Sequence, residues 1–418
     1  MSDAQIQVRM YNVGFGDCFL LRIPTPQGER RMLVDCGYHS QGKGKFSDRE
    51  LITQIKADLK GQPLDVVVAT HRHQDHISGF GEPDLWEGIG VEEVWLPFTA
   101  NPEAAEDEPS LAAWVALTQS VDELLDKDKK KLTASAIHAL GARDPQEIEA
   151  AEFMLWNARA NAPGLENLLN GMRRSDGQKS VRRFLPDAVD AYPSQFNTPA
   201  LPGVTVHVLG PPKDPKFRKN KKVPSGWALA DAGPAGGKGG SPFSDEWRVP
   251  ADRLPPSLPV NPSNFRSIRL FNDDLLNTAK ALDGFLNGES LVLVLEIGKA
   301  RLLLTGDAEV GAWTQILDNP AALELASSAT FFKVGHHGSH NATPVRFVRE
   351  HLAKKTPAVI STQEGDGKYR NGIPFGHLLE EMKGRQIAYV RSDQPPANGD
   401  ATFTPTPDAR WVDVVIPC

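Results

Sequence analysis

The sequence predicts an α/β protein in which helices cover layers of β-sheet, and three observations lead to this fold class. Strand-like apolar segments alternate with helix-like segments over the first hundred residues. The chain has 418 residues, of which 40% are apolar and 24% charged, which is typical of a globular protein with a large core. Several apolar segments end in histidines or aspartates, as strands do where an α/β sheet carries its site.

The first half of the fold is expected over residues 1–99. Here "QIQVRMYNV", "CFLLRIP" and "RRMLVDCG" are predicted strands, because their apolar residues alternate or run together between turn residues. A helix is expected around 47–60, and two further strands in "LDVVVAT" and "VEEVWLP".

The composition changes near residue 100, and residues 100–185 are predicted to be a helical insertion. Segments such as "DPQEIEAAEFMLWNARANAPGLENLLNGMRR" are rich in Ala, Leu and Glu, with the apolar spacing of amphipathic helices. The insertion is a candidate docking surface for a protein partner or for a second copy of the chain.

The second half of the fold is expected over residues 186–418, with a Gly/Pro-rich loop at 211–262. "GVTVHVLGPP" is a predicted strand, and "ESLVLVLEIGKARLLLTGDAE" a hairpin that turns at Gly298 and Lys299. After "ATFFKVGHHGSHNATP" we expect a helix, the strand "PAVIST", a helix around 376–384 and the closing strand "WVDVVIPC".

Charge and cysteine content narrow the function classes. The formal net charge of −7 argues against a protein that grips long nucleic acid with its whole surface. Three cysteines are too few for a secreted disulfide framework. The start of the chain lacks the pattern of a signal peptide, and no apolar stretch approaches membrane-spanning length, so a cytoplasmic protein without a membrane partner is expected.

The segment "THRHQDH" places His71, His73, Asp75 and His76 within six positions, directly after an apolar strand. Side chains at i and i+2 of an extended segment leave on one side, so His71 and His73 can converge on one cation while Asp75 and His76 reach a second. Ordinary surface or core histidines would not explain this density. Imidazole and carboxylate ligands suit Zn²⁺, Mn²⁺ or Fe²⁺.

Two distant segments are predicted to complete the site, because they also follow apolar strands. Asp307 ends "LLLTGD", and His336 and His337 end "FFKVGHH". In a layered sheet such strand ends gather at one edge.

These motifs resemble those of the metallo-β-lactamase superfamily, in "THRHQDH", "LLTGD" and "KVGHHGS". More narrowly, "NVGFGDCFLLRI", "MLVDCG" and "NGIPFGHLLEEM" resemble, in order, the hydrolase domain of competence-type DNA-uptake proteins and its stand-alone relatives. The resemblance implies a four-layer αββα sandwich with a dinuclear metal site between the two sheets.

The resemblance also implies a role for each motif residue. His71 and His73 would hold the first metal, Asp75 and His76 the second, and Asp307 would bridge both. His336 would be the last ligand of the second metal, with His337 as its alternative. Asp17 and Asp35 match motif positions that would support the ligands rather than bind metal. The cofactor would be one or two divalent ions, zinc or manganese.

The sequence departs from the family pattern at one ligand. Many members have a third histidine for the first metal, and the nearest candidate here is His207 in "VTVHVLGPP". Its place in an alternating strand favours a structural role, which leaves a single-metal enzyme as an alternative. His377 matches a late histidine of the competence-type tail, where it would touch substrate or leaving group, unless it is structural.

A metal ion lowers the pKa of water to about 7, so that hydroxide can attack an ester or phosphodiester near neutral pH. The resemblance favours a phosphodiesterase or nuclease, in which Asp75 would be catalytic. One alternative is an ester or lactone hydrolase with a pocket around Trp114 and Trp156, and another is a non-catalytic metal-bound partner module. Basic tracts at 172–183 and 216–222 could grip phosphates or be solvated, and the net charge favours short or single-stranded nucleic acid, or nucleotides, as substrate.

Overall fold

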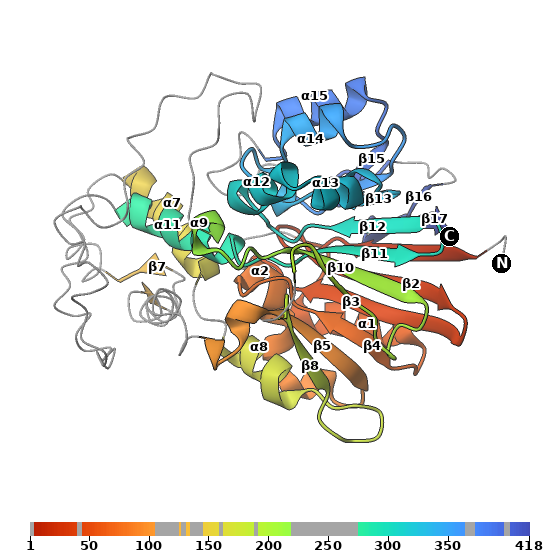
Figure 1. Cartoon of the computed structure of the whole chain (residues 1–418). Coiled ribbons are helices and arrows are strands. Elements are labelled where there is room, and N and C mark those ends of the chain that lie inside the picture. Colours follow the sequence, from red (N-terminus) through yellow and green to blue (C-terminus); the bar gives the residue numbers. More distant parts are fainter. Residues whose placement is uncertain are drawn as a thin grey trace.

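The computed structural model describes residues 4–39, 44–104, 125–126, 131–133, 145–158, 162–187, 191–218, 275–363, 373–396 and 402–418. Two large β-sheets lie face to face in the centre of the molecule, with helices on their outer sides (Figure 1). A small two-stranded sheet, β6 (Leu125–Asp126) with β7 (Lys131–Leu132), lies apart from them.

The first large sheet has the strand order β16-β17-β1-β2-β3-β4-β5-β8. Its strands are β1 (Gln5–Tyr11), β2 (Cys18–Thr25), β3 (Gly28–Cys36), β4 (Leu64–Val68), β5 (Val91–Pro97), β8 (Val181–Leu185), β16 (Phe403–Pro405) and β17 (Trp411–Pro417). The strands from β3 to β8 run parallel, whereas β1 and β2 pair antiparallel. The parallel strands therefore end at a common edge.

The second large sheet has the order β15-β14-β13-β12-β11-β10-β9. Its strands are β9 (Ser194–Phe196), β10 (Val204–Gly210), β11 (Val292–Ile297), β12 (Ala300–Leu304), β13 (Phe331–Lys333), β14 (Ala358–Ile360) and β15 (Tyr389–Arg391). The predicted hairpin is confirmed, since β11 and β12 pair antiparallel across a turn in which Gly298 has the left-handed φ of 59°. From β12 to β15 the strands are parallel.

Helices lie on the outer faces of both sheets and at one end of the sandwich (Figure 1). They are α1 (Asp48–Leu59), α2 (Gln74–Ile77), α3 (Pro83–Trp86), α7 (Pro145–Ala158), α8 (Ala162–Glu166), α9 (Pro215–Arg218), α11 (Leu275–Asn287), α12 (Val310–Asp318), α13 (Pro320–Ser327), α14 (Val345–Glu350) and α15 (Gly376–Gly384). Short 3₁₀ turns are η1 (Ser78–Gly81), η2 (Phe98–Ala100) and η6 (His336–Gly338), and η3 (Asn167–Gly171) is one turn of π-helix.

Three apolar cores separate four layers. Alternate residues of the strands, such as Phe19 and Leu21 on β2 and Leu293 on β11, meet in the core between the sheets. The residues between them face outward: Leu20 packs toward α1 and Val294 toward α12 to α15. Each large side chain buried in this way contributes about 1.5–3 kcal/mol to folding. The predicted four-layer αββα sandwich is confirmed.

The insertion predicted for 100–185 includes a strand of the main sheet. Residues 181–185 form β8, which pairs in parallel with β5 from Glu93 onward. The expectation of helices up to residue 185 is therefore wrong at its end, because β8 buries Leu185 in the core between the sheets. Most of 105–144, and of the loop predicted for 211–262, lies outside the described residues, and the domain limits stay predictions.

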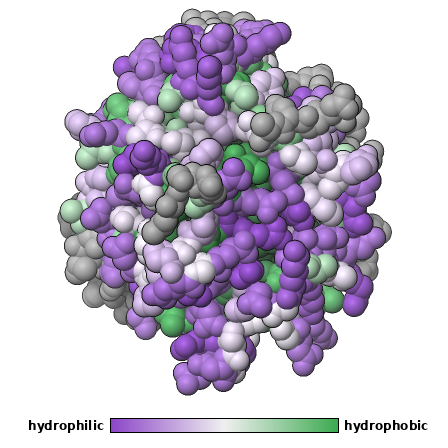
Figure 2. All heavy atoms as spheres, turned by 90° about the vertical axis from the view of Figure 1, so that its right-hand side faces the viewer, coloured by the Kyte–Doolittle hydropathy of each residue, from purple (hydrophilic) through white to green (hydrophobic). Residues whose placement is uncertain are grey.

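One face of the molecule can be described by its hydropathy. The face that carries the two chain ends is mainly hydrophilic, with small apolar patches between polar groups (Figure 2). No helix among the described residues is long and apolar enough to cross a membrane.

Candidate metal centre

The predicted ligands come together because the strands that precede them end at one edge of the sandwich. The histidine motif follows β4 and runs into α2, while Asp307 follows β12 and His337 follows β13. β12 and β13 are parallel neighbours, so their following residues leave the sheet together. A backbone hydrogen bond of 2.9 Å from Leu291 N to Thr70 O ties the loops of the two sheets to each other.

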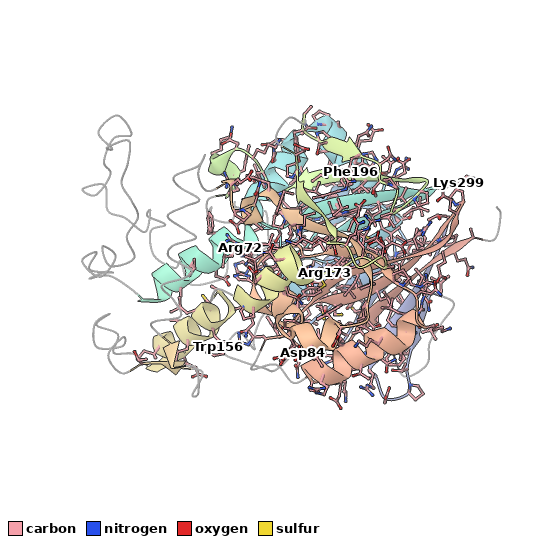
Figure 3. All side chains as sticks on the ribbon, turned by 90° about the horizontal axis from the view of Figure 1, so that it is seen from below. Arg72, Asp84, Trp156, Arg173, Phe196 and Lys299 are labelled. Carbon is pink, nitrogen blue, oxygen red and sulfur yellow. The ribbon has the colours of Figure 1, made fainter. Side chains whose placement is uncertain are left out.

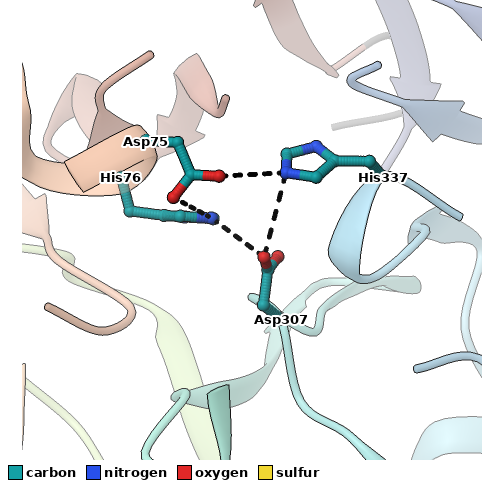
Figure 4. Close-up of side chains that lie close together, drawn as sticks. All are labelled: Asp75, His76, Asp307 and His337. Atoms are coloured by element: carbon teal, nitrogen blue, oxygen red, sulfur yellow. Dashed lines mark hydrogen bonds and ion pairs between the residues drawn. The ribbon is translucent and has the colours of Figure 1, made fainter. Parts of the chain in front are cut away.

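Four buried side chains form what we call the central cluster: Asp75, His76, Asp307 and His337 (Figure 4). His76 Nε2 lies 3.1 Å from Asp307 Oδ2 and 3.8 Å from Asp75 Oδ1. His337 Nε2 lies 3.1 Å from Asp75 Oδ2 and 4.0 Å from Asp307 Oδ2. Two imidazole nitrogens and two carboxylates thus converge on one point.

A second group adjoins this cluster and shares Asp75 with it. His71, His73 and Asp75 each offer one ligand atom, and these atoms lie within 4.8 Å of one another. His71 Nε2 and His73 Nδ1 are 3.0 Å apart. The two groups place Asp75 between two positions that could each hold a cation.

Most of these histidines turn one ring nitrogen into the site and anchor the other outside it. His76 Nδ1 lies 2.7 Å from Asp35 Oδ2, His337 Nδ1 2.8 Å from Ser361 O, and His71 Nδ1 3.2 Å from Thr70 Oγ1. Such outer partners fix the orientation of a metal-binding imidazole. Asp35 also accepts bonds of 2.7 Å from the Thr70 amide and hydroxyl, so the support role predicted for it agrees with its contacts.

A buried lysine stands beside the carboxylates. Lys333 on β13 is 4% exposed, and its Nζ donates to Gly306 O at 2.9 Å and lies 3.5 Å from Asp307 Oδ1. It also makes an ion pair with Asp17 Oδ2. The backbone amide of Asp17 donates to Asp75 O at 3.0 Å, so Asp17 supports the motif from the turn before β2 rather than entering the central cluster.

Backbone strain is concentrated at the site. Asp35, His336 and His337 have positive φ values of 57°, 45° and 53°, which cost about 1–3 kcal/mol each for residues with a Cβ. Gly37 touches the backbone of the motif so closely that a Cβ there would lie 2.4 Å from His76 N. The surrounding packing holds these residues in unfavourable conformations, as is common at functional sites.

The pKa values show how the charges interact in the chain without metal. Burial lowers the pKa of His71 and of His73, the latter to about 4, and the charge on His76 adds to the effect. Burial would also lower the pKa of His76, but the carboxylates of Asp307 and Asp35 raise it well above its usual range. Burial would raise the pKa of Asp75, but charged His76 and His337 lower it. A proton on His76 therefore supplies positive charge between the carboxylates.

The donor set fits divalent metal ions. His73 Nε2 and Asp75 Oδ1 are buried and have no hydrogen-bond partner among the described residues, which is costly unless another group satisfies them. Two carboxylates and four imidazoles, three of them with an anchored outer nitrogen, are ligands that Zn²⁺ and Mn²⁺ accept. One or two such ions would be held by His71 and His73 and by the central cluster.

Three predicted residues lie elsewhere. His336 was expected to be the last ligand, but the neighbouring His337 occupies the central cluster, and His336 Nδ1 lies 3.6 Å from Glu309 Oε1 instead. The left-handed backbone of both residues, with φ of 45° and 53°, sets the different directions of the two rings. His207 sits on β10 between inward-facing Val206 and Val208 and pairs with Glu296 at 3.0 Å, away from the cluster.

His377 begins α15, with its side chain 47% exposed and 3.3 Å from Glu380 Oε2. Its neighbour Phe375 donates a 2.8 Å backbone bond to Gly338 O, which places the start of α15 against the turn that carries His337. No contact of His377 with the central cluster is seen among the described residues.

The sequence reasoning missed several residues of the site. Lys333 could have been predicted from the sequence, because it is a lone cation in the apolar strand "FFKV". No sequence pattern predicted Asp283 or Asn157, which reach the site on the helices α11 and α7. Asn157 Oδ1 accepts a 3.2 Å hydrogen bond from Asp75 N. Asp283 Oδ1 lies 3.7 Å from His73 Nε2. Glu309 stands two positions after Asp307 and is 7% exposed.

The first basic tract lies at the far end of the sheet. Arg173 (labelled in Figure 3) accepts a 2.7 Å backbone bond from Val91, where β5 starts, whereas the metal ligands follow the ends of the parallel strands. Arg174 and Arg183 of this tract are paired with Glu92 and Glu93. In the second tract, 219–222 lies outside the described residues, as does Trp114, while Trp156 is buried in α7.

Comparisons with known proteins agree with the motifs. Residues 11–96 match the family model described as the metallo-beta-lactamase superfamily. A segment of 108 residues is 32% identical to ComE operon protein 3 of Bacillus subtilis, covering 26% of this chain and 13% of that protein. The chain therefore spans only a small part of this relative. A HARLDQ motif mutant of a metallo-beta-lactamase from Cronobacter sakazakii is similar at 14% identity over 48% of this chain and 50% of that chain, with a TM-score of 0.18.

The predicted resemblance is confirmed by these findings, and the matched residues 11–96 contain the whole His71–His76 motif. The four-layer fold and the grouped histidines and aspartates extend the likeness to the second half of the chain. The chain thus has a segment similar to the metallo-beta-lactamase superfamily, within a four-layer α/β fold that carries groups suited to metal binding.

Proposed function

We propose that this chain is a metal-dependent phosphodiesterase or nuclease that acts on nucleic acid or nucleotides. The observation that carries the proposal is the position of Asp75, whose carboxylate belongs both to the group with His71 and His73 and to the central cluster. Enzymes that cleave phosphodiesters with two metal ions use such an arrangement, in which one carboxylate lies between two cation positions.

Each residue of the metal centre has a proposed role. His71 and His73 would hold one ion, and His76, Asp307 and His337 would hold the other, with Asp75 shared between the two positions. Where one ion suffices, the central cluster would hold it. The bound metal supplies Lewis acidity and water whose pKa falls to about 7. Asp35 and Ser361 keep the rings of His76 and His337 in place, at 2.7 and 2.8 Å. Lys333 fixes the direction of Asp307.

His377 is proposed to meet the substrate or its leaving group. It is exposed, at the first turn of α15, and this turn packs against the His337 segment through the Phe375 to Gly338 bond of 2.8 Å. From this position the exposed imidazole would reach a ligand bound at the metal centre without itself being buried.

The substrate class is argued from charge. The chain carries a net charge of −7, and much of its first basic tract is paired and remote from the cluster. Long duplex DNA, which needs many free cations along its backbone, fits this surface poorly. We propose short or single-stranded nucleic acid, or nucleotides, consistent with the resemblance to DNA-uptake hydrolase domains. A cytoplasmic location and docking through the insertion stay predictions.

The test is a hydrolysis assay on the purified, metal-loaded chain. Substrates are bis-p-nitrophenyl phosphate, single-stranded DNA, duplex DNA, RNA and a lactone panel, each with Mn²⁺ or Zn²⁺. We expect phosphodiester cleavage that Asp75→Asn reduces by about 10²-fold or more, as removal of a group that stabilises the transition state does. His207→Ala, a histidine of the same sheet outside the cluster, should keep wild-type activity.

Other outcomes would point elsewhere. Turnover of lactones alone would replace the proposal by the ester or lactone hydrolase. A chain that binds metal but leaves every substrate intact would instead indicate a non-catalytic partner module.

A further inference from the structure

Besides the central cluster and the group of His71, His73 and Asp75, a third set of metal-ligating side chains lies close by, and the proposed function does not use it. We call Asp283, Glu309 and His336 the α11 group, because α11 contributes Asp283. One ligand atom from each lies within 4.8 Å of the others. His336 Nδ1 is 3.6 Å from Glu309 Oε1 and has no hydrogen-bond partner among the described residues.

We propose that the α11 group, together with Asn287, binds a further divalent cation, separate from the positions held by His71 and His73 and by the central cluster. Two carboxylates, an imidazole and an amide oxygen form an oxygen-rich set of the kind that Mn²⁺ or Mg²⁺ accepts.

Asn287 provides an independent sign of a missing cation. Its side chain is fully buried, and its Nδ2 donates to Glu309 Oε1 at 2.9 Å and to Asp283 Oδ2 at 3.4 Å, so its positive amide end lies between the two carboxylates. Its Oδ1 is buried, and no described residue donates a hydrogen bond to it. A rotation of the amide by half a turn would satisfy this oxygen on a cation at the place where the NH₂ group now stands.

His73 provides further support for a cation at this place. It is 1% exposed, and its Nε2, which has no hydrogen-bond partner among the described residues, faces Asp283 Oδ1 at 3.7 Å. This separation is too long for a hydrogen bond. The bond that is missing between these two atoms leaves Asp283 Oδ1 able to take another ligand beside the first metal position.

The charge of the whole site also favours another cation. Six carboxylates lie in and around it: Asp17, Asp35, Asp75, Asp283, Asp307 and Glu309. Lys333 supplies one positive charge and two divalent ions would supply four, which leaves the site negative if the histidines are neutral. With all six carboxylates ionised by their bound metals, one further divalent ion makes the sum positive, which favours an anionic substrate.

The α11 group is open enough to exchange an ion with solvent. The side chains of Asp283 and His336 are 20% and 17% exposed, whereas those of the central cluster are exposed by 2% or less. The additional ion should therefore bind more weakly and leave first when the protein is dialysed.

The experiment is a metal count on the full-length chain. The protein is stripped with chelator, and the bound Mn²⁺ is then counted by equilibrium dialysis at increasing free Mn²⁺ until binding saturates. We expect the wild type to hold one more ion per chain than Asp283→Asn or Glu309→Gln. Glu296→Gln, another carboxylate-to-amide change on the second sheet, should retain the full number. Equal counts in the wild type and Asp283→Asn would overturn the proposal.

Asn287→Asp separates a cation site from a purely structural role for this residue. If the group binds a cation, the added carboxylate tightens Mn²⁺ binding by about tenfold, and Mn²⁺ raises the melting temperature of the variant more than that of the wild type. If Asn287 only bridges the carboxylates, the variant melts lower and Mn²⁺ does not restore it. Neither readout depends on phosphodiester cleavage, so an inactive chain that binds the extra ion would overturn only the proposed function.

Discussion

Replacement of Lys333 by methionine should destabilise the protein strongly, because the side chain is a buried cation between acidic groups. Its Nζ lies 3.5 Å from Asp307 Oδ1, donates to Gly306 O at 2.9 Å and pairs with Asp17. Methionine has a similar length but no charge. The variant therefore keeps most of the packing and leaves two buried carboxylates without their counterion.

The expected cost follows from these contacts. With an effective dielectric constant of about 20, attraction across 3.5 Å amounts to about 5 kcal/mol for the Asp307 pair alone. The desolvation of a buried ammonium offsets several kcal/mol of this gain. Loss of one partner from a buried pair typically costs about 3–5 kcal/mol, and we expect this range for Lys333→Met.

The assay is urea unfolding of the metal-free chain at neutral pH, followed by fluorescence and circular dichroism. The double variant Asp17→Asn with Lys333→Met should regain about 1–3 kcal/mol relative to Lys333→Met, since the two side chains interact directly. Lys299→Met, at the exposed hairpin turn labelled in Figure 3, removes the same charge and should change stability by about 0.5 kcal/mol or less. A Lys333→Met protein as stable as wild type, or strictly additive double-variant effects, would refute the reasoning.

Three further predictions concern the metal centre. Asp35→Asn should weaken metal binding about 10- to 100-fold, because the carboxylate 2.7 Å from His76 Nδ1 is replaced by an amide. Isothermal titration with Mn²⁺ measures the affinity, and an unchanged affinity would contradict this prediction. The metal-free chain should lose stability as pH rises above about 6.5, since the pKa of His76 and of His337 is raised, so that the folded protein holds protons that the unfolded chain has released. Burial raises the pKa of Glu309 to about 8, so this residue lowers stability in the same direction. A melting temperature that increases with pH over this range would contradict the expectation. Gly37→Ala should destabilise by about 1–3 kcal/mol and reduce metal binding, because its Cβ would meet the His76 backbone, whereas Gly384→Ala meets nothing within 4 Å and serves as control in thermal melts.

Much of the fold was readable from the order of residues along the chain. The strand segments from "QIQVRMYNV" to "VEEVWLP" and the hairpin at Gly298 lie where their apolar patterns predicted. These features depend on contacts between residues near in sequence, whose alternation fixes which side of a strand is buried. Asp75 and His76 were likewise predictable as neighbours, since both lie on the single turn that follows β4.

Other features arise only when distant segments meet. The selection of His337 over His336 depends on two left-handed residues that pattern analysis does not reveal. β8 joins the sheet although helical sequence precedes it, because its backbone pairs with β5 across about ninety residues of chain. Asp283 and Asn157 reach the site on α11 and α7, whose own sequences resemble ordinary amphipathic helices.

The physical reason for this division is the range of the interactions. Backbone geometry repeats every few residues, so local sequence specifies strands, turns and the strand ends that bear polar groups. The direction of a buried charge, in contrast, is decided by the total field of its neighbours, and those of Asp307 come from β13 and α2 as well as its own loop. Only the packing of the two sheets brings these groups within the few ångströms at which their charges act.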